Sequence, residues 1–403
     1  MRKIEEIENG LKDIFAHFDN VALLNQKKVL NAMQEEGLGT RHFSGTSGYG
    51  YDDIGRQALA NVFSKVFGGE DAIVSPNLTC GSHAIAVVLF GLLRPNDLMI
   101  SVAGKPYDTL DETIFGAEGE NRGSLKDLGV SYAQVDLKND NLNFEEIERQ
   151  VKEMQPKVVF LQRSRGYNWR NSISIEDIEK CVKITKKVSP NSIFVVDNCY
   201  GEFVAEKEPT DVGADIVVGS LIKNPGGGLA STGGYIVGKK QYIELISYRL
   251  TSPSLGVEVG SYERGYREFF QGLFIAPHVV AQAVKGAYLI GEVMADKGYE
   301  VMPSSKEIAG DIIKSIKFND EKAMISFIQR IQMFSPIDSN FLPMPWDMPG
   351  YLDPIIMAAG TFVSGASIEL SSDGPVKAPY IAYFQGALTY EHAKLVAINL
   401  LEE

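Results

Sequence analysis

The feature that most constrains this chain is a regular alternation of two patterns between residues 57 and 238. Short apolar segments have the length of buried strands, at 71–76, 97–102, 130–136, 157–162, 192–198, 214–220 and 233–238. Longer segments with helical spacing lie between them, at 57–67, 82–93, 144–154 and 175–188. Strands that are apolar on both faces and alternate with helices are typical of a mainly parallel sheet covered by helices. The sequence therefore predicts a large α/β domain.

The flanking regions differ from this alternation. Residues 1–36 have the apolar spacing of a helix, and helical patterns return at 277–296, 305–314 and 390–402. Expected short strands in the last third are AMISFIQRIQ (323–332), SIELSS (367–372) and YIAYFQ (380–385). These patterns predict an N-terminal helical arm with a glycine-rich loop (1–56), a large domain (57–290) and a smaller α+β domain (291–403).

Charge and cysteine content narrow the class of protein. The 39 Lys and Arg residues against 52 Asp and Glu residues give a net charge of −13, which disfavours nucleic acid and anionic membranes as partners. The three cysteines are scattered, with no metal-ligand spacing, and fit a reducing compartment better than a disulfide framework. MRKIEEIENG has acidic residues where a signal peptide has an apolar core, and no apolar run predicts a membrane span. We expect a cytoplasmic protein without a metal site.

The segment GLGTRHFSGTSGYGYDDIGR (37–56) has unusual backbone demands. One interpretation is a flexible linker. Arg41, His42, Tyr49, Tyr51 and Arg56 argue for a functional loop instead, because large charged and aromatic residues are uncommon in a simple linker.

Two segments are predicted to carry chemistry. The buried strand SIFVVDN ends in Asp197, and the carboxyl end of a parallel strand is where such sheets bind ligands. In ADIVVGSLIKNPGGG a strand ends near Gly219, and Ser220 and Lys223 follow in a glycine-rich turn. A desolvated Lys in such a turn can form a Schiff base. The alternatives are a loop-capping Asp and a phosphate-binding or surface Lys.

This layout resembles the fold-type I pyridoxal phosphate (PLP) enzymes, and within them the methionine γ-lyase and cystathionine lyase group, in the branch of aluminium-resistance proteins. The resemblance covers nearly the whole chain. The motifs that carry it are RHFSGTSGYGYDDIGR, CGSHAI, GKPYDTLDETI, VVDNCYGEF, GSLIKNPGGG and SIELSSDGP…PYIAYFQGALTYEH.

The resemblance implies a role for each matching residue. Lys223 would bind the cofactor covalently, and Asp197 would keep its pyridinium nitrogen protonated. Ser220 and the amides of Gly81 and Ser82, at a helix N-terminus, would bind the cofactor phosphate. Tyr107 would stack on the cofactor ring, although it could also be a half-buried core tyrosine.

Two further implications involve departures from the family pattern. In the related lyases a Tyr and an Arg from the neighbouring subunit reach the cofactor phosphate. Tyr51 matches the Tyr. The family's Arg follows two residues after that Tyr, where this chain has Asp53, so Arg56 is the nearest candidate for the Arg. The resemblance thus implies at least a dimer, and a dimer of dimers as in the related tetramers.

The second departure concerns the substrate. The related lyases bind the substrate α-carboxylate with a C-terminal arginine, but no arginine follows Arg330 here. Lys377 is the cation nearest that strand, and Arg165 or its neighbour Arg163 is the alternative.

The implied activity is elimination from a sulfur-containing amino acid. Lys223 would take the Cα proton, and a tyrosine, Tyr107 or Tyr51, would assist proton transfer. The products would be a thiol, ammonia and a keto acid. An aldolase, racemase, decarboxylase or synthase on the same fold stays open, as does a non-catalytic scaffold.

Overall fold

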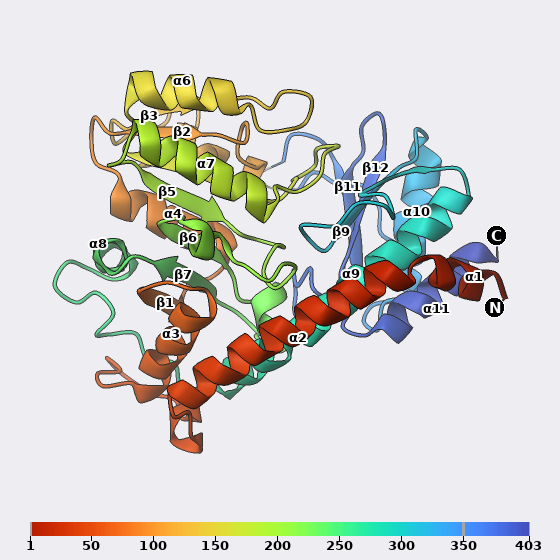
Figure 1. The fold of residues 1–403 in the computed structure, drawn as a ribbon, viewed down its shortest axis with the longest axis horizontal. Helices are drawn as coiled ribbons and strands as arrows, with labels where there is room; N and C mark the ends of the chain where they lie inside the picture. The colour runs from red at the N-terminus through yellow and green to blue at the C-terminus, as the bar shows by residue number, and fades with distance from the viewer. Residues whose placement is uncertain (1, 349–350, 403) are drawn as a thin grey trace.

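Two β-sheets organise the protein, a large one from the middle of the chain and a small one from its last third (Figure 1). The computed structural model describes residues 2–348 and 351–402. Residue 1 of the predicted helical arm, and residues 349, 350 and 403 of the predicted small domain, lie outside the described residues.

The large sheet contains the seven strands that the alternation predicted. Its order is β1-β7-β6-β5-β4-β2-β3, in which β7 is antiparallel to both neighbours and the other pairs are parallel. The strands are β1 (Asp71–Ser75), β2 (Leu98–Ser101), β3 (Ser131–Gln134), β4 (Val158–Gln162), β5 (Ile193–Asp197), β6 (Ile216–Ser220) and β7 (Gly234–Gly238).

Helices cover both faces of this sheet because successive strand residues point to opposite sides. Val195 and Val218 join a core cluster with α4 (Gly81–Leu92) and α8 (Lys240–Leu250). Phe194 and Val196 face the other way, towards α6 (Phe144–Met154) and α7 (Ile175–Val188). The helix α3 (Ile54–Val66) packs beside β1, while the short α5 (Asp111–Phe115) and α8 had no predicted counterpart.

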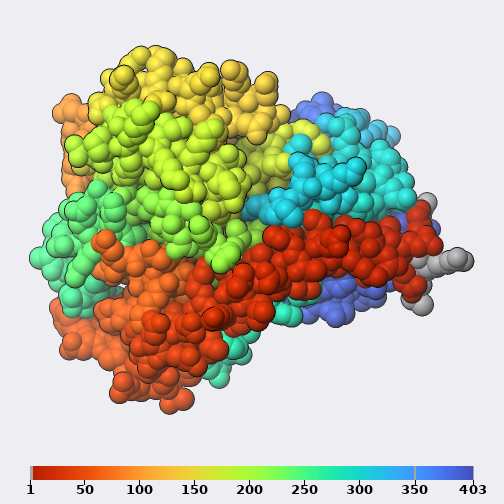
Figure 2. Space-filling model, in the orientation of Figure 1, coloured from red at the N-terminus to blue at the C-terminus, as the bar shows by residue number. Residues whose placement is uncertain are grey.

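Long helices connect the two sheets. The predicted helix 1–36 is divided at Leu11 into α1 (Arg2–Gly10) and α2 (Lys12–Glu35). The helix α2 packs against α9 (Arg267–Asp296), and in Figures 1 and 2 α2 runs along the surface from the large sheet to the small one. The boundary predicted between residues 290 and 291 falls inside α9, so this helix extends across both predicted domains. The division into domains stays a prediction.

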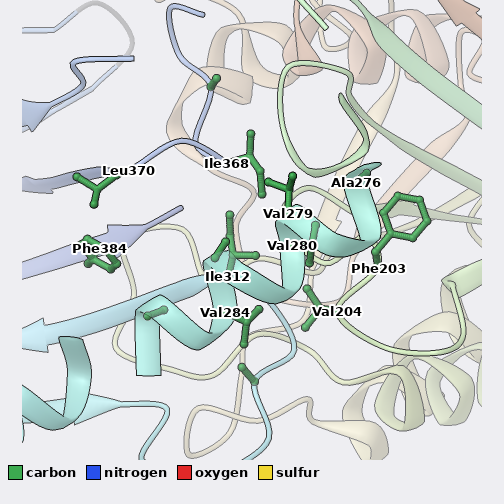
Figure 3. Close-up of a cluster of buried hydrophobic side chains, with 14 of the residues drawn as sticks. Phe203, Val204, Ala276, Val279, Val280, Val284, Ile312, Ile368, Leu370 and Phe384 are labelled. Atoms are coloured by element: carbon green, nitrogen blue, oxygen red, sulfur yellow. The ribbon is translucent and has the colours of Figure 1, made fainter. Parts of the chain in front are cut away.

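The apolar core extends along α9. In Figure 3, Val279 and Val280 of α9 lie near Phe203 and Val204 of the loop after β5, with Ile368 of the last third close by; these side chains belong to one buried cluster. By length and composition α9 could cross a membrane, but 72% of its most apolar window is buried inside the protein. This burial is what a core helix shows.

The small sheet is antiparallel throughout. Its order is β10-β11-β12-β9-β8, with helices packed beside it. The elements are β8 (Glu300–Met302), β9 (Ile313–Lys317), α10 (Glu321–Met333), β10 (Ile355–Ala358), β11 (Ser371–Pro375), β12 (Ile381–Gln385) and α11 (Tyr390–Leu401). The predicted strand 380–385 and helix 390–402 are confirmed by β12 and α11.

Three predictions in this region are wrong. AMISFIQRIQ is part of helix α10: its buried Met324, Phe327 and Ile328 have helical spacing, and the Asp320 side chain caps the helix by accepting a hydrogen bond from the Ala323 amide. The predicted helix 305–314 is a turn that leads into β9. Most of SIELSS is also a turn, and the strand begins only at Ser371.

Candidate active site

A pocket of about 520 Å³ opens at the carboxyl ends of the large-sheet strands and is bounded on its other side by the small sheet. Both sheets supply its walls. This is the edge where parallel α/β sheets bind ligands, because loops diverge there and leave a crevice.

Three neighbouring strands each end in a polar residue at this pocket: Gln162 of β4, Asp197 of β5 and Ser220 of β6. Gln162 and Asp197 are paired across their strands. The amide of Cys199 donates to Asp197 Oδ1 at 3.1 Å. The apolar strand bodies are buried in the sheet, so the first polar side chain of each strand emerges at the pocket.

Lys223 lies three residues after β6, where the chain turns tightly into the short helix η4 (Asn224–Gly226). A Cβ at Gly226 would lie 1.9 Å from the carbonyl oxygen of Leu221, so the turn requires glycine there. Lys223 Nζ lies 4.2 Å from the centroid of the Tyr200 ring, a cation–π contact. The turn therefore holds the ammonium group in the pocket that Asp197 also lines.

Burial and neighbouring charge act in opposite directions on the pKa values of Asp197 and Lys223. Burial raises the pKa of Asp197, and the charge of Lys223 lowers it less, so the pKa lies above the usual range. Burial disfavours the Lys223 ammonium, but interactions with Cys199, Tyr200, Tyr107 and Asp197 outweigh burial and raise the Lys223 pKa. Without a bound ligand Lys223 is therefore a cation, and its use as a base requires that these surroundings change.

The N-terminus of α4 forms one end of the pocket. Cys80 Sγ caps the helix by accepting from the His83 amide at 3.4 Å. The first amides of a helix have no partner within it, which leaves those of Gly81 and Ser82, both lining the pocket. Ser220 lies beside Gly81, and its Oγ is buried with no hydrogen-bond partner among the described residues.

These donors fit a phosphate group. Helix N-termini bind anions through free amides and the helix dipole. A buried hydroxyl without a partner is costly and points to a ligand that supplies one. Together with Lys223 and Asp197, this arrangement fits PLP.

Tyr107 is held beside the same helix. Its amide donates to Gln162 Oε1 at 2.8 Å, and its hydroxyl is hydrogen-bonded to Ser82 Oγ, which also contacts Thr109 Oγ1 at 3.1 Å. Burial, followed by the charge of Asp197, raises the Tyr107 pKa well above its usual value. The hydroxyl therefore keeps its proton at neutral pH.

The structure does not bring Tyr51 and Arg56 to the pocket of their own chain. Tyr51 is 56% exposed and stacks on Tyr49. Arg56 donates to the carbonyl oxygens of Gly50, Gly260 and Glu258, which fixes the glycine-rich loop against another segment. The loop is thus held in place by specific contacts, unlike a flexible linker.

The two candidates for the substrate carboxylate lie in different environments. Lys377 lines the pocket and pairs with Asp353 at 2.6 Å, with both side chains partly exposed. Arg165 is fully buried, pairs with Asp311 at 2.9 Å and donates to Met302 O and Ser315 Oγ. Because these partners occupy its guanidinium away from the pocket lining, the structure argues against Arg165 as a carboxylate ligand.

Arg163 is also directed elsewhere, since it donates to Asn198 Oδ1 at 2.8 Å and to Gly201 O. Gln162, Tyr200 and Asp373 are among the pocket residues that were not predicted. Gln162 ends a predicted strand and Tyr200 lies three residues after Asp197, so both had a local signal. Asp373 lies in the motif SIELSSDGP, but no local pattern placed it at the pocket, because it comes from β11 in the small sheet.

Comparison with solved structures identifies the class of proteins that share this fold. The PLP-dependent protein YhfS from Escherichia coli matches 94% of this chain and 96% of its own with a TM-score of 0.62; at 15% identity it shows the fold alone. The chain thus has the fold of the fold-type I PLP enzymes, as predicted.

Sequence comparison identifies the family. The chain belongs to the methionine gamma-lyase family, whose pattern it matches over residues 1–403. The carbon–sulfur lyase involved in aluminum resistance from Clostridium novyi NT is 50% identical, with a TM-score of 0.95 over 99% of this chain and 94% of that one. The uncharacterized protein YnbB of Bacillus subtilis (strain 168) is 46% identical over 96% of this chain and 92% of its own. These findings confirm the predicted resemblance.

Proposed function

We propose that this protein is a PLP-dependent lyase that cleaves a carbon–sulfur bond in an amino acid. One observation carries the proposal: Asp197 and Lys223 line one pocket, where the buried Ser220 hydroxyl lies beside the N-terminus of α4 and has no hydrogen-bond partner among the described residues. The family supports the lyase class, and the relative from Clostridium novyi supports carbon–sulfur cleavage.

The residues divide the work between binding and proton transfer. Bound PLP supplies a ring that accepts the electrons of a breaking substrate bond. Ser220 Oγ and the amides of Gly81 and Ser82 bind and orient the phosphate. Asp197 would keep the ring nitrogen protonated. Because Asp197 is buried, water would not screen this interaction.

Proton movement at the substrate falls to Lys223 and Tyr107. Lys223 Nζ takes the proton from the substrate Cα, a role that requires it to be neutral at that moment. Tyr107 retains its hydroxyl proton and is placed by Ser82 and Gln162, so it can protonate the departing sulfur. Lys377 at the pocket edge is our proposal for the carboxylate ligand, since its pair with Asp353 is exposed enough to exchange.

We also propose that the active unit is a homo-oligomer, a dimer of dimers, in the cytoplasm. The exposed, stacked Tyr49 and Tyr51 support a subunit contact, through which Tyr51 and Arg56 would reach the neighbouring pocket. Cys80, Cys181 and Cys199 are all free thiols, as expected in a reducing compartment.

The visible absorption spectrum of the purified protein with added PLP tests the cofactor and its lysine. We expect a band from a lysine-bound cofactor in the parent, and a shift to the free-cofactor spectrum in Lys223→Ala. A matched control is Lys377→Ala, which also removes a pocket lysine and should keep the band. A parent protein that takes up no PLP would refute the proposal.

Thiol release from cystathionine, methionine and cysteine then tests the reaction. The same cofactor site could serve an aldolase, racemase, decarboxylase or synthase. A coloured protein that releases no thiol from any thioether would therefore exclude the lyase while keeping the cofactor.

A further inference from the structure

The small sheet presents one wall to the pocket, and this wall has an unusual charge. Met357 of β10 is paired with Asp373 of β11, which is paired with Tyr383 of β12. Paired residues on neighbouring strands point to the same face, and all three line the pocket. The adjoining pair, Ser371 and Gln385, lines it as well. On these three paired strands the pocket-facing wall thus has a carboxylate at its centre and neutral side chains around it.

Asp373 has no cation beside it. Within residues 2–348 and 351–402 it forms no ion pair, and its side-chain partners are neutral: the Gln385 amide, which donates to Oδ2 at 3.4 Å, and the Tyr167 hydroxyl. By contrast, Asp353 at the pocket edge pairs with Lys377 at 2.6 Å. Asp373 is therefore a carboxylate of the pocket whose charge the protein leaves without a close partner.

The electrostatic surroundings agree with this description. Burial raises the pKa of Asp373 to about 7, while the Tyr167 hydroxyl and the charge of Lys223 lower it less. Asp373 is thus close enough to Lys223 for their charges to interact, on the opposite wall of the pocket. A desolvated carboxylate without a cation is costly, and a ligand that brings a cation removes that cost.

The neighbouring rings suit the same ligand. Tyr167 lies 5.2 Å from Tyr383 and 5.8 Å from Tyr351, measured between ring centroids, and all three line the pocket. Aromatic faces accommodate both an apolar chain and an attached ammonium group.

We propose that Asp373 determines specificity by binding a protonated amine on the far side of the substrate's sulfur atom. This inference rests on the proposed carbon–sulfur lyase function and names its substrate class: thioether amino acids that carry a second amino group. An arginine on this wall would select a carboxylate, whereas the carboxylate present selects a cation.

A matched pair of thioethers tests the inference in the PLP-loaded protein. S-aminoethyl-cysteine and S-propyl-cysteine have the same chain length and differ in a terminal ammonium or methyl group. Because a hydrogen bond to a charged group contributes roughly 10- to 150-fold, we expect kcat/KM for thiol release to favour the aminoethyl compound by about that factor. Asp373→Asn should abolish the preference mainly through KM, and Asp373→Glu should restore part of it.

Binding measurements keep the test independent of turnover. Lysine and norleucine contain no sulfur to release and also differ by one terminal ammonium. We expect calorimetry to show tighter binding of lysine, lost in Asp373→Asn and retained in the control Asp353→Asn. Equal binding of the two, or stronger binding of S-carboxymethyl-cysteine than of the aminoethyl compound, would overturn the inference.

The outcomes also separate the two proposals. Thiol release without a preference for the amine would refute the role of Asp373 and leave the lyase function intact. An Asp373-dependent preference for lysine without thiol release from any thioether would refute the lyase function and keep the amine site.

Discussion

Replacing Ser220 with alanine tests whether this serine binds a ligand or stabilises the fold. The Ser220 hydroxyl is buried and has no hydrogen-bond partner among the described residues. A buried polar group without a partner costs about 1–3 kcal/mol, so its removal should not weaken the cofactor-free protein. We expect Ser220→Ala to have an unchanged or higher free energy of unfolding without PLP.

The same change should weaken cofactor binding. A hydrogen bond to a charged phosphate contributes about 1.5–3 kcal/mol, so the dissociation constant for PLP should rise roughly 10- to 150-fold. Urea unfolding with and without PLP measures the first effect, and titration of PLP followed by absorbance measures the second.

Ser101→Ala is the matched control. Ser101 is also buried at the end of a large-sheet strand, but its hydroxyl donates to the Gly104 carbonyl oxygen. Its loss should lower the free energy of unfolding by about 0.5–1.5 kcal/mol and leave PLP affinity unchanged. If Ser220→Ala instead lost stability without PLP and bound PLP as tightly as the parent, the reasoning about Ser220 would be wrong.

Two further predictions concern buried charges. Burial raises the pKa of Glu202 from 4.5 to about 8, and Tyr235 donates to it at 2.7 Å. The folded state thus holds a proton that the unfolded state releases, so stability is full below about pH 4.5 and falls as pH rises towards 8; urea unfolding across that range should show this slope, and Glu202→Gln should remove it. Arg165→Met leaves Asp311 unpaired and should cost about 3–5 kcal/mol of unfolding free energy. Adding Asp311→Leu should recover much of that loss, and a selective rise in substrate KM would contradict the structural role of Arg165.

Much of the large sheet could be predicted because its signal is local. Each strand is a short apolar segment bounded by polar residues, and this pattern predicted all seven strands. It also predicted that Asp197 and Ser220 lie at strand ends. Parallel strands place their carboxyl ends at one edge, so the proximity of these residues followed from the same pattern.

The C-terminal third shows where local patterns fail. AMISFIQRIQ is apolar enough for a strand, but its buried residues have helical spacing and Asp320 caps the segment as a helix. Apolar content alone does not distinguish a buried strand from a buried helix.

The sequence by itself determined the strands of the large sheet and the family, and it predicted the residues that would hold the cofactor, because each of these depends on neighbours along the chain. Only the tertiary structure placed Asp373 in the pocket, paired Arg165 with Asp311 and left the Ser220 hydroxyl without a hydrogen-bond partner in the part of the chain that the structure describes. These facts depend on which polar groups packing brings into one desolvated space. Arg165 and Asp311 lie far apart in the chain, so no local pattern records that they meet.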